Sequence, residues 1–251
     1  MTDFKVDKHW QENYDSYYSE DQTEWRRLGA IDKAENILSF CKDLSIRSLI
    51  DIGAGEGAVL QRLSELGFAE DYYCVEISTT GVDTIKKRNI RNLKECKVFD
   101  GYSIPYDDKR FDLSILSHVI EHAEHPRKLL TEAKRAAKYV FIEVPLEDNM
   151  RLPDDFVMDK VGHINFYSAK TIRRLLQTCG LKVLKQKVVH ASKAVYAYRK
   201  SRMALLQYYL KENLLRFFPK LAGLLFTYHC AILCSDQNDP TVKIPPGSLK
   251  M

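Results

Sequence analysis

The sequence has almost no excess of charge of either sign. Its 251 residues include 38 lysines and arginines and 34 aspartates and glutamates, which gives a formal net charge of +4. Proteins that bind nucleic acid through its phosphates usually carry a strongly basic balance or a basic patch. We therefore expect no nucleic-acid partner. The 45% of apolar residues is the share of an ordinary folded domain and not of a disordered chain.

Long apolar runs are also missing. The longest, Leu221–Cys234, is broken by Thr227, Tyr228 and His229, and a helix needs about 20 apolar residues to cross a bilayer. The opening residues, MTDFKVDKHWQENYD, are polar and acidic where a signal peptide has a basic start and an apolar centre. We expect neither a membrane span nor export.

Cysteines are few and scattered. The six of them include no CxxC pair, which is the spacing typical of zinc sites and redox motifs. The sequence therefore predicts no disulfide framework and no cysteine-based metal site, and a reducing, cytoplasmic location fits it.

Strand and helix patterns alternate through most of the chain. Ser45–Ile52 is an apolar strand that leads through glycines into helical spacing at Ala58–Leu66. This alternation predicts an α/β fold, with a parallel sheet covered by helices on both faces. The other predicted strands are Tyr72–Ile77, Phe111–Leu116 and Tyr139–Val144, and the helices lie near 80–89, 125–137 and 168–178.

We divide the chain into three regions. Residues 1–40 are rich in aromatics and predict a helical cap over an edge or mouth of the sheet. Residues 41–234 form the main domain, with a helical insertion at about 195–222 between strands at 181–190 and 225–234. Residues 235–251 are polar, contain three prolines and predict a flexible tail.

Three glycines stand where the first strand passes into a helix, in Asp51-Ile-Gly53-Ala-Gly55-Glu-Gly57. Glycine allows the positive φ angles and the close backbone approach that a nucleotide-like ligand needs. The string also fits the dinucleotide pattern GxGxxG/A, and Glu76 ends the next strand about 20 residues on, where a ribose-binding carboxylate belongs. This motif alone does not choose between cofactors, and a tight turn without a ligand uses the same residues.

Polar residues at the other strand ends favour a cationic cofactor. A carboxylate at Asp51 would repel the pyrophosphate of NAD and attract a sulfonium or ammonium group. Asp100, before Gly101, can accept a hydrogen bond from an adenine amino group, although an Asp that caps a turn before Gly gives the same pattern. Ser117 and His118 end a further strand at the same rim of the sheet.

In this order, the segments resemble the class I S-adenosylmethionine-dependent methyltransferases, and especially the branch of the ubiquinone-biosynthesis O-methyltransferases. The resemblance runs from about Asp51 to Gly180 and is carried by DIGAGEG, CVEIS, DGYSIPYDDKRFDLSILSHVIEHAEHP and GHINFYSAKTIRRLLQTCGL. It implies a Rossmann-like, seven-stranded sheet of order 3-2-1-4-5-7-6. The antiparallel seventh strand would be Leu225–Cys234.

The resemblance also implies a role in binding S-adenosylmethionine for each matched residue. Asp51, Gly53, Gly55 and Gly57 would surround its methionine and ribose, and Glu76, with Ile77 after it, would take the ribose hydroxyls. Asp100 and Gly101 would hold the adenine edge, and Ser117 with His118 would flank the methionine and the sulfonium.

Methyl transfer from a sulfonium is an in-line displacement, in which the protein mainly aligns the nucleophile and excludes water. A hydroxyl acceptor must also lose a proton, and a side chain can take it. The candidates are His118, Glu121, His122 and His163. Each also has a structural reading, because this stretch can simply shape its loop, and His163 can fix the loop that resembles the family's acceptor-facing segment.

The string His118-Val-Ile-Glu121-His122 also matches the HxxEH pattern of a zinc-protease class, which requires one helix, whereas here it follows a strand. In the ubiquinone branch the corresponding ExxEH stretch is implicated in divalent-metal binding. Glu121 and His122 match it, but His118 replaces the first acid, and hard cations prefer oxygen ligands. We expect no metal.

The sequence thus predicts a cytoplasmic S-adenosylmethionine-dependent methyltransferase, with O-methylation of a small organic molecule as the first expectation. Methylation of carbon, nitrogen or a protein is the alternative, and a nicotinamide-dependent oxidoreductase or a non-catalytic cofactor-binding protein also stays open. Aromatic and basic residues between 196 and 218 predict an aromatic or apolar acceptor, peripheral membrane contact or a dimer interface, and a buried packing stripe gives the same pattern. The chain would act as a monomer or a homodimer.

Overall fold

A computed structural model describes residues 23–156 and 162–240. Its seven strands form one sheet in the order β3-β2-β1-β4-β5-β7-β6, as predicted. Strands β1 to β5 all run parallel to one another, and β7 runs antiparallel to both of its neighbours, β5 and β6. The strands are β1 Ser48–Ile52, β2 Asp71–Glu76, β3 Leu93–Val98, β4 Phe111–Ser117, β5 Ala137–Leu146, β6 Leu181–Val189 and β7 Tyr228–Asp236.

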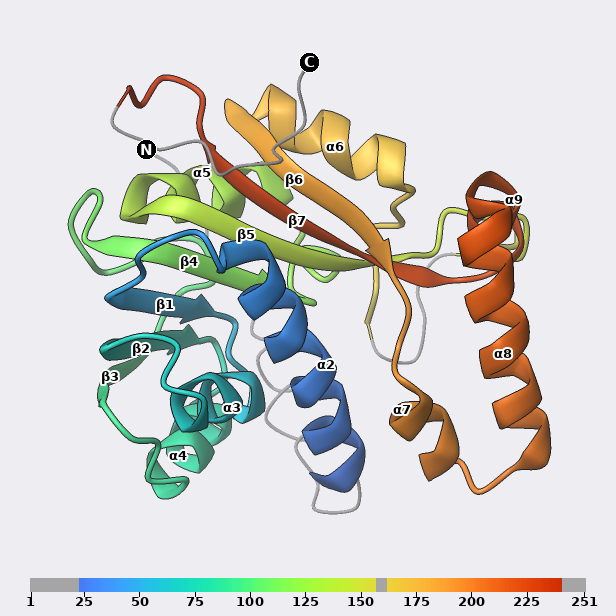
Figure 1. The fold of residues 1–251 in the computed structure, drawn as a ribbon. Coiled ribbons are helices and arrows are strands. Elements are labelled where there is room, and N and C mark those ends of the chain that lie inside the picture. Colours follow the sequence, from blue (N-terminus) through green and yellow to red (C-terminus); the bar gives the residue numbers. More distant parts are fainter. Residues whose placement is uncertain (1–22, 157–161, 241–251) are drawn as a thin grey trace.

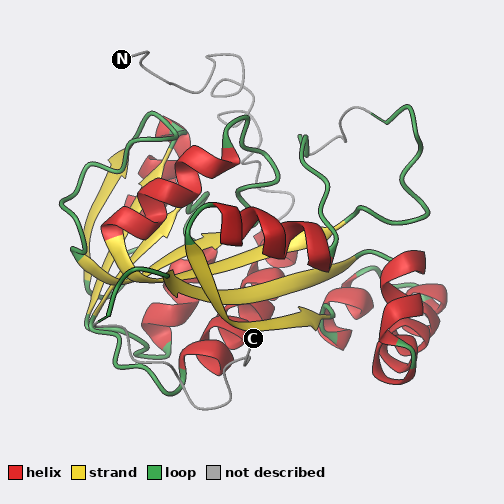
Figure 2. Cartoon of the chain, turned by 90° about the horizontal axis from the view of Figure 1, so that it is seen from above, coloured by secondary structure: helices red, strands yellow, loops and turns green. Residues whose placement is uncertain are grey.

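Helices cover both faces of this sheet (Figures 1 and 2). One face carries α2 (Thr23–Cys41), α3 (Ala58–Glu65) and α4 (Thr79–Lys87). The opposite face carries α5 (Pro126–Ala136) and α6 (Ala169–Thr178). Three more helices connect β6 to β7, namely α7 (Lys193–Tyr198), α8 (Arg202–Phe217) and α9 (Pro219–Leu225). No helix within the described ranges is long and apolar enough to span a membrane.

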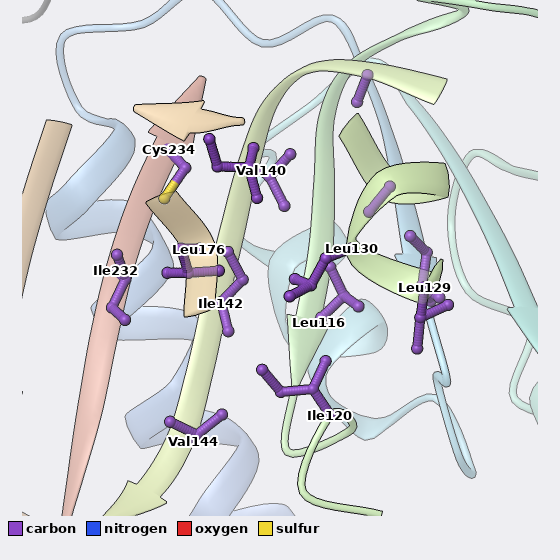
Figure 3. Packing of buried hydrophobic residues seen from close by; sticks show 14 of the residues in the cluster. Leu116, Ile120, Leu129, Leu130, Val140, Ile142, Val144, Leu176, Ile232 and Cys234 are labelled. Atoms are coloured by element: carbon purple, nitrogen blue, oxygen red, sulfur yellow. The ribbon is translucent and has the colours of Figure 1, made fainter. Parts of the chain in front are cut away.

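Each face of the sheet has its own apolar core, because successive side chains of a strand point to opposite faces. On the α5 and α6 side, Leu130 and Leu176 pack against Ile142 and Ile232 of the central strands (Figure 3). On the α2 side, Ile37 packs in the cluster that contains Leu49, Phe141 and Leu233. This alternation also decides which face each polar residue at a strand end occupies.

The boundaries of the last strand differ from the sequence prediction. The prediction began it at Leu225, but Pro219–Leu225 forms α9, for which a proline in the first turn is well suited. At the other end, Ser235 pairs with Tyr139 and is 1% exposed, so β7 continues to Asp236. The strand therefore takes two residues from the segment assigned to a flexible tail, while residues 241–251 lie outside the described residues.

The amino-terminal region is described from Thr23 onward, and the aromatic residues before it lie outside the described part. Helix α2 packs directly on the sheet, with Ala34 and Ile37 fully buried. Its first turn meets α7, since the Trp25 and Tyr198 rings lie 5.9 Å apart. The insertion between β6 and β7 is helical and runs from Lys193 to Leu225.

Candidate active site at the carboxyl ends of the strands

A cavity of about 670 Å³ lies where the carboxyl ends of β1, β2, β4 and β5 meet α2 and the segments around α7 and α8. Its size is within the usual range of small-molecule sites. Open α/β sheets bind ligands outside the carboxyl ends of their strands. We call the part formed by Asp51, Gly53, Gly55 and Glu76 the glycine side. The histidine side is formed by His118, His122, Glu143, His163 and His229, together with Glu121, which contacts His118 but does not line the cavity.

The glycine turn needs glycine for two reasons. Gly53 and Gly55 have φ values of 72° and 59°, in the region that other residues avoid. A Cβ atom added at Gly53 would also lie 2.9 Å from a methyl carbon of Val119. The backbone N–H of Gly53 donates to the carbonyl of Val75 at 2.8 Å, which ties the turn to β2.

Glu56 fixes the same turn to the helices around it. Its carboxylate accepts from Arg88 at 2.7 Å and from Arg26 of α2 at 3.2 Å. Arg88 also donates from Nε to the Glu56 carbonyl at 2.5 Å. The side chain of Glu56 is almost buried, so these charge-assisted bonds hold the loop in one position.

Glu76 at the end of β2 is 3% exposed, and its carboxylate accepts three backbone hydrogen bonds. The donors are Gly55 at 2.7 Å, Ile77 at 2.9 Å and Ser78 at 3.1 Å. The carboxylate is therefore held in one orientation at the edge of the cavity, which also joins the glycine turn to the second strand.

Asp51 is the second-last residue of β1, two positions before Gly53, and is also 3% exposed. Burial raises the pKa of its carboxyl group to about 7, and the nearby Glu76 adds to this, while the ammonium of Lys33 on α2 opposes it. In turn, burial lowers the pKa of Lys33, against the attraction of Glu143, Glu121 and Asp51. The cavity floor is thus acidic and would favour a cation.

Strand alternation explains why these charges gather on the α2 face. Asp51, Glu143 and His229 each stand two positions from an apolar residue that faces α2. The antiparallel β7 starts where β5 ends, since Tyr228 pairs with Leu146. A residue at the beginning of β7 therefore joins residues at the ends of β4 and β5. The three apolar neighbours are Leu49, Phe141 and Ala231.

The centre of the histidine side is Glu143, which is 1% exposed. Its Oε1 lies 3.7 Å from Nε2 of His118 and 3.6 Å from Nδ1 of His229, and the two imidazole rings are 4.7 Å apart. Its Oε2 accepts a hydrogen bond from Asn36 at 3.0 Å. Burial alone would raise the pKa of Glu143, but the contacts with His118 and His229 outweigh it and hold the pKa well below its usual range.

Glu121 is fully buried and lies on the other side of His118, with Oε1 3.2 Å from Nδ1. Burial raises its pKa, but His118 and His122 more than offset this and bring the pKa to about 2. His118 itself has a φ of 58°, which is unusual for a residue with a side chain. Its backbone N–H donates to the carbonyl of Glu143 at 2.8 Å.

His163 and His122 form the remaining pair, with their rings 4.7 Å apart. Nδ1 of His163 lies 2.8 Å from Oε2 of Glu147, so a carboxylate orients this imidazole. Nδ1 of His122 lies 3.1 Å from the carbonyl oxygen of Gly162. Burial lowers the pKa of His122, although Glu121 acts in the opposite direction. A proton on Nδ1 of His163 would leave Nε2 as its basic nitrogen.

Trp25, Tyr196, Tyr228 and Lys211 also line the cavity, and we call them the aromatic wall. The ammonium of Lys211 is 4.9 Å from the centre of the Tyr228 ring and donates to the carbonyl of Thr227 at 2.7 Å. Lys211 is only 8% exposed. Burial lowers its pKa to about 8, and Arg199 and Arg151 act in the same direction. A buried cation among aromatic rings suits a ligand that is aromatic or negatively charged.

Most of the residues predicted from the sequence line this cavity, but three do not. Asp100 accepts backbone hydrogen bonds from Tyr102 at 2.8 Å and Ser103 at 2.6 Å, which is the turn-capping arrangement. Gly57 is the N-cap of α3, and Glu121 lies behind His118. The predicted residues that do line it are Asp51, Gly53, Gly55, Glu76, Ile77, Gly101, Ser117, His118, His122 and His163.

The sequence predicts no site role for Lys33, Glu143, Glu147 or His229, and it includes Lys211 only among the basic residues between 196 and 218. Glu143 carried a signal, because it is an acid inside the apolar run Tyr139–Val144. His229 likewise interrupts an apolar stretch. Lys33 and Lys211 lie on helices with many charged residues, and nothing in their local sequence separates them from solvent-facing lysines.

Comparisons with known proteins place the chain among methyltransferases. A family model described as a methyltransferase domain matches residues 20–186, more than half of the chain. An uncharacterised protein of Methanocaldococcus jannaschii, MJ1123, is 25% identical over 180 residues, which cover 67% of this chain and 80% of that protein.

Three solved structures are similar in fold. A SAM-dependent methyltransferase from Aquifex aeolicus has a TM-score of 0.52 at 16% identity, over 92% of this chain and all of that one. A geranyl diphosphate methyltransferase in complex with GPP and sinefungin has a TM-score of 0.61 at 11% identity, over 82% and 77%. The [4+2]-cyclase SpnF has a TM-score of 0.60 at 13% identity, over 82% and 80%. The cyclase shows that this fold also supports reactions other than methyl transfer, so the reaction must be inferred from the site.

Proposed function

Because the chain belongs to the methyltransferase-domain family, we propose that it transfers a methyl group from S-adenosylmethionine to an oxygen of a small aromatic acceptor. One observation carries this proposal. A single cavity joins a glycine turn with two buried carboxylates to a cluster of imidazoles at the next strand ends. The first part suits a cationic nucleoside, and the second suits an acceptor that has to lose a proton.

The residues on the glycine side fit the cofactor. Gly53 and Gly55 present backbone without side chains to the cavity, and the Glu76 carboxylate is held where it can accept from ribose hydroxyls. Asp51 adds negative charge close to where a sulfonium would lie. When bound, S-adenosylmethionine supplies an activated methyl carbon. Ser117 and His118 would border the methionine, and Gly101 would border the adenine.

The histidine side would handle the proton. We assign His163 as the general base and Glu147 as the positioning residue that orients it, since a carboxylate on one imidazole nitrogen leaves the other to accept a proton. His122 packs against His163 and, with Glu121, would support its position. His118 would lie nearest the methyl donor.

The aromatic wall supports the choice of acceptor. Tyr196, Tyr228 and Trp25 offer ring faces to an aromatic molecule, and Lys211 offers a buried positive charge to a phenolate or carboxylate. This acceptor class agrees with the resemblance to the ubiquinone-biosynthesis branch. Carbon or nitrogen acceptors would have less need of the His163–Glu147 pair.

Two measurements test the proposal. Titration calorimetry with S-adenosylmethionine, S-adenosylhomocysteine and NAD should give binding of the first two. Binding of NAD alone would overturn the cofactor assignment. A screen of phenols, quinone precursors, sugars and lipid-like acids with radiolabelled donor should then give product from phenolic compounds. Label transferred only to amines or proteins would overturn the acceptor assignment.

A further inference from the structure

Beyond the proposed methyl transfer, we infer that His118, Glu143 and His229 bind a divalent transition-metal ion. The three residues come from the ends of β4 and β5 and the start of β7, and their donor atoms all lie within 4.8 Å of one another. Two imidazoles and one carboxylate are a ligand set that suits ions such as Fe²⁺, Zn²⁺, Co²⁺ or Mn²⁺. This inference departs from the sequence-based expectation of no metal. That expectation was argued from the HxxEH stretch, and the site proposed here takes only His118 from it.

The distances are those of ligands around an ion and not of direct hydrogen bonds. Oε1 of Glu143 is 3.7 Å from Nε2 of His118 and 3.6 Å from Nδ1 of His229. Ligand atoms about 2.1 Å from a tetrahedral metal are separated by about 3.4 Å. The two separations from Oε1 of Glu143 exceed this value by only a few tenths of an ångström, so small side-chain rotations would bring these atoms to it.

One of the three donor atoms has no other partner. Nε2 of His118 is buried and makes no hydrogen bond to any residue within the described ranges. A buried nitrogen of this kind normally has a partner in native proteins. A metal ion bound by Glu143 and His229 would supply it.

The surrounding contacts orient the ligands as metal sites require. Nδ1 of His118 faces Oε1 of Glu121 at 3.2 Å, so that a proton there points to a carboxylate and the lone pair of Nε2 points to the cluster. Oε2 of Glu143 accepts from Asn36 at 3.0 Å, which leaves Oε1 for the ion. Carboxylates and amides in this second layer commonly hold metal ligands in place.

The charge balance favours a cation at this position. Glu143 and Glu121 are both fully buried or nearly so, and Oε2 of Glu121 lacks a hydrogen-bond partner in the described part of the chain. Asp51 adds a third buried acid, and all three attract the ammonium of Lys33. Buried carboxylates are costly unless they are paired or coordinate a metal.

The site would have open coordination positions toward the cavity, because His118, Glu143 and His229 all line it and supply three ligands. An acceptor hydroxyl bound there would lose its proton more readily. This consequence rests on the proposed function, whereas metal binding itself does not.

Metal content tests the inference directly. The full chain, stripped with a chelator, is dialysed against Co²⁺, Zn²⁺ or Mn²⁺, and bound metal is measured by mass spectrometry together with the visible spectrum of the Co²⁺ form. We expect one ion per chain for at least one of these metals. His229→Ala and Glu143→Gln should lose the ion, and Asn36→Ala should weaken binding about tenfold or more.

Matched controls separate this site from its neighbours. His125→Ala removes a histidine that does not line the cavity and should leave the metal content unchanged, and circular dichroism melts show whether each variant folds. Failure of the wild-type chain to bind any of the three ions would overturn the inference. Loss of the ion in His122→Ala, with retention in His229→Ala, would place it on the other histidines instead. A metal-loaded chain without methyl transfer would count against the proposed function alone.

Discussion

The two sides of the cavity differ in how fully their polar atoms are satisfied. On the glycine side, the Glu76 carboxylate accepts three backbone hydrogen bonds and Glu56 is held by two arginines. On the histidine side, His118 Nε2, Glu121 Oε2 and the neighbouring Ser117 Oγ are buried without hydrogen-bond partners in the described residues. One cavity thus joins a side whose polar atoms are hydrogen-bonded in the free protein to a side where several are not.

This difference indicates a division of labour. A ligand that always has the same shape can be met by a rigid, satisfied surface, because no further ordering is needed on binding. Polar atoms that stay unpaired in the free protein are costly to stability and are tolerated where a ligand or a reaction uses them. The glycine side should therefore govern affinity for the methyl donor, and the histidine side should govern turnover.

Removing the proposed base should have the largest effect. We expect His163→Ala to lower kcat about 100-fold or more, because a positioned general base contributes about 10²–10⁴, while the affinity for S-adenosylmethionine changes little. Steady-state kinetics on an acceptor found by screening, with calorimetry for the donor, would measure both. Glu147→Gln should lower kcat by less, and its deficit should vary with pH.

The matched control for this experiment is His125→Ala, which lies outside the cavity and should keep wild-type kcat. His118→Ala should also lower turnover more than donor affinity. Full turnover in both His163→Ala and His118→Ala would remove the histidines from the mechanism and erase the contrast between the two sides.

The complementary change on the glycine side is Glu76→Gln. The amide can no longer accept from Gly55, Ile77 and Ser78 at once, so both the turn and the ribose site should suffer. We expect donor affinity to fall on the order of 100-fold, or about 3 kcal/mol, since hydrogen bonds to a charged group contribute about 1.5–3 kcal/mol each. Calorimetry measures the loss, and Glu70→Gln at an exposed position is the control. A normal dissociation constant in Glu76→Gln would contradict the assignment.

Replacing Asp51 should change the affinity for the donor by a smaller amount, and this change should depend on pH. Burial raises its pKa to about 7, with Glu76 adding to the shift and Lys33 opposing it. The carboxylate form would attract the cationic donor, so affinity should rise with pH as the proton leaves. A pKa near 7 predicts about a tenfold gain between pH of about 6 and about 8. Calorimetry across this range should show the gain in the wild type and a flat profile in Asp51→Asn.

Some features of the site could be predicted from the sequence and others could not. The strand order followed from the family resemblance and is confirmed. The closeness of the DIGAGEG turn to Glu76 was predictable from the residues themselves, because one helix separates them and they end neighbouring parallel strands. The sequence predicts His118 and His122 just after a strand end and His163 in the loop that resembles the family's acceptor-facing segment. The sequence leaves two roles open for Asp100, a ligand contact and a turn cap, and its bonds to Tyr102 and Ser103 have the turn-capping arrangement.

The contacts between the histidines and their acidic partners could not be predicted from the sequence, for a physical reason. Glu143 and His229 meet only because β7 runs antiparallel to β5, which brings the start of one strand to the end of the other across more than 80 residues of sequence. Lys33 reaches the same place from α2. Such contacts depend on strand register and helix placement, and local patterns of apolar and polar residues do not encode them.

We expect the smallest effect from a substitution in the aromatic wall. This substitution should increase the stability of the protein, whereas substitutions on the glycine side cause a loss. Lys211 is 8% exposed, and burial lowers its pKa to about 8, below the value of an unfolded chain. Its charge therefore costs stability below a pH of about 8, and this cost disappears as pH rises from about 8 toward the unfolded value of about 10.4. We expect Lys211→Met to raise the free energy of unfolding by about 1 kcal/mol at neutral pH, with the lost Thr227 bond and ring contacts offsetting part of the gain.

Denaturant titrations of both proteins at a series of pH values would measure this difference. The advantage of Lys211→Met should shrink as the pH approaches the unfolded value. Glu56→Gln, which leaves Arg26 and Arg88 facing a neutral amide, should instead be less stable than the wild type. If Lys211→Met were as destabilising as Glu56→Gln, the contacts of Lys211 would stabilise the fold as much as those of Glu56 do. Lys211 would then be a structural residue and not a charge that is available to bind an acceptor.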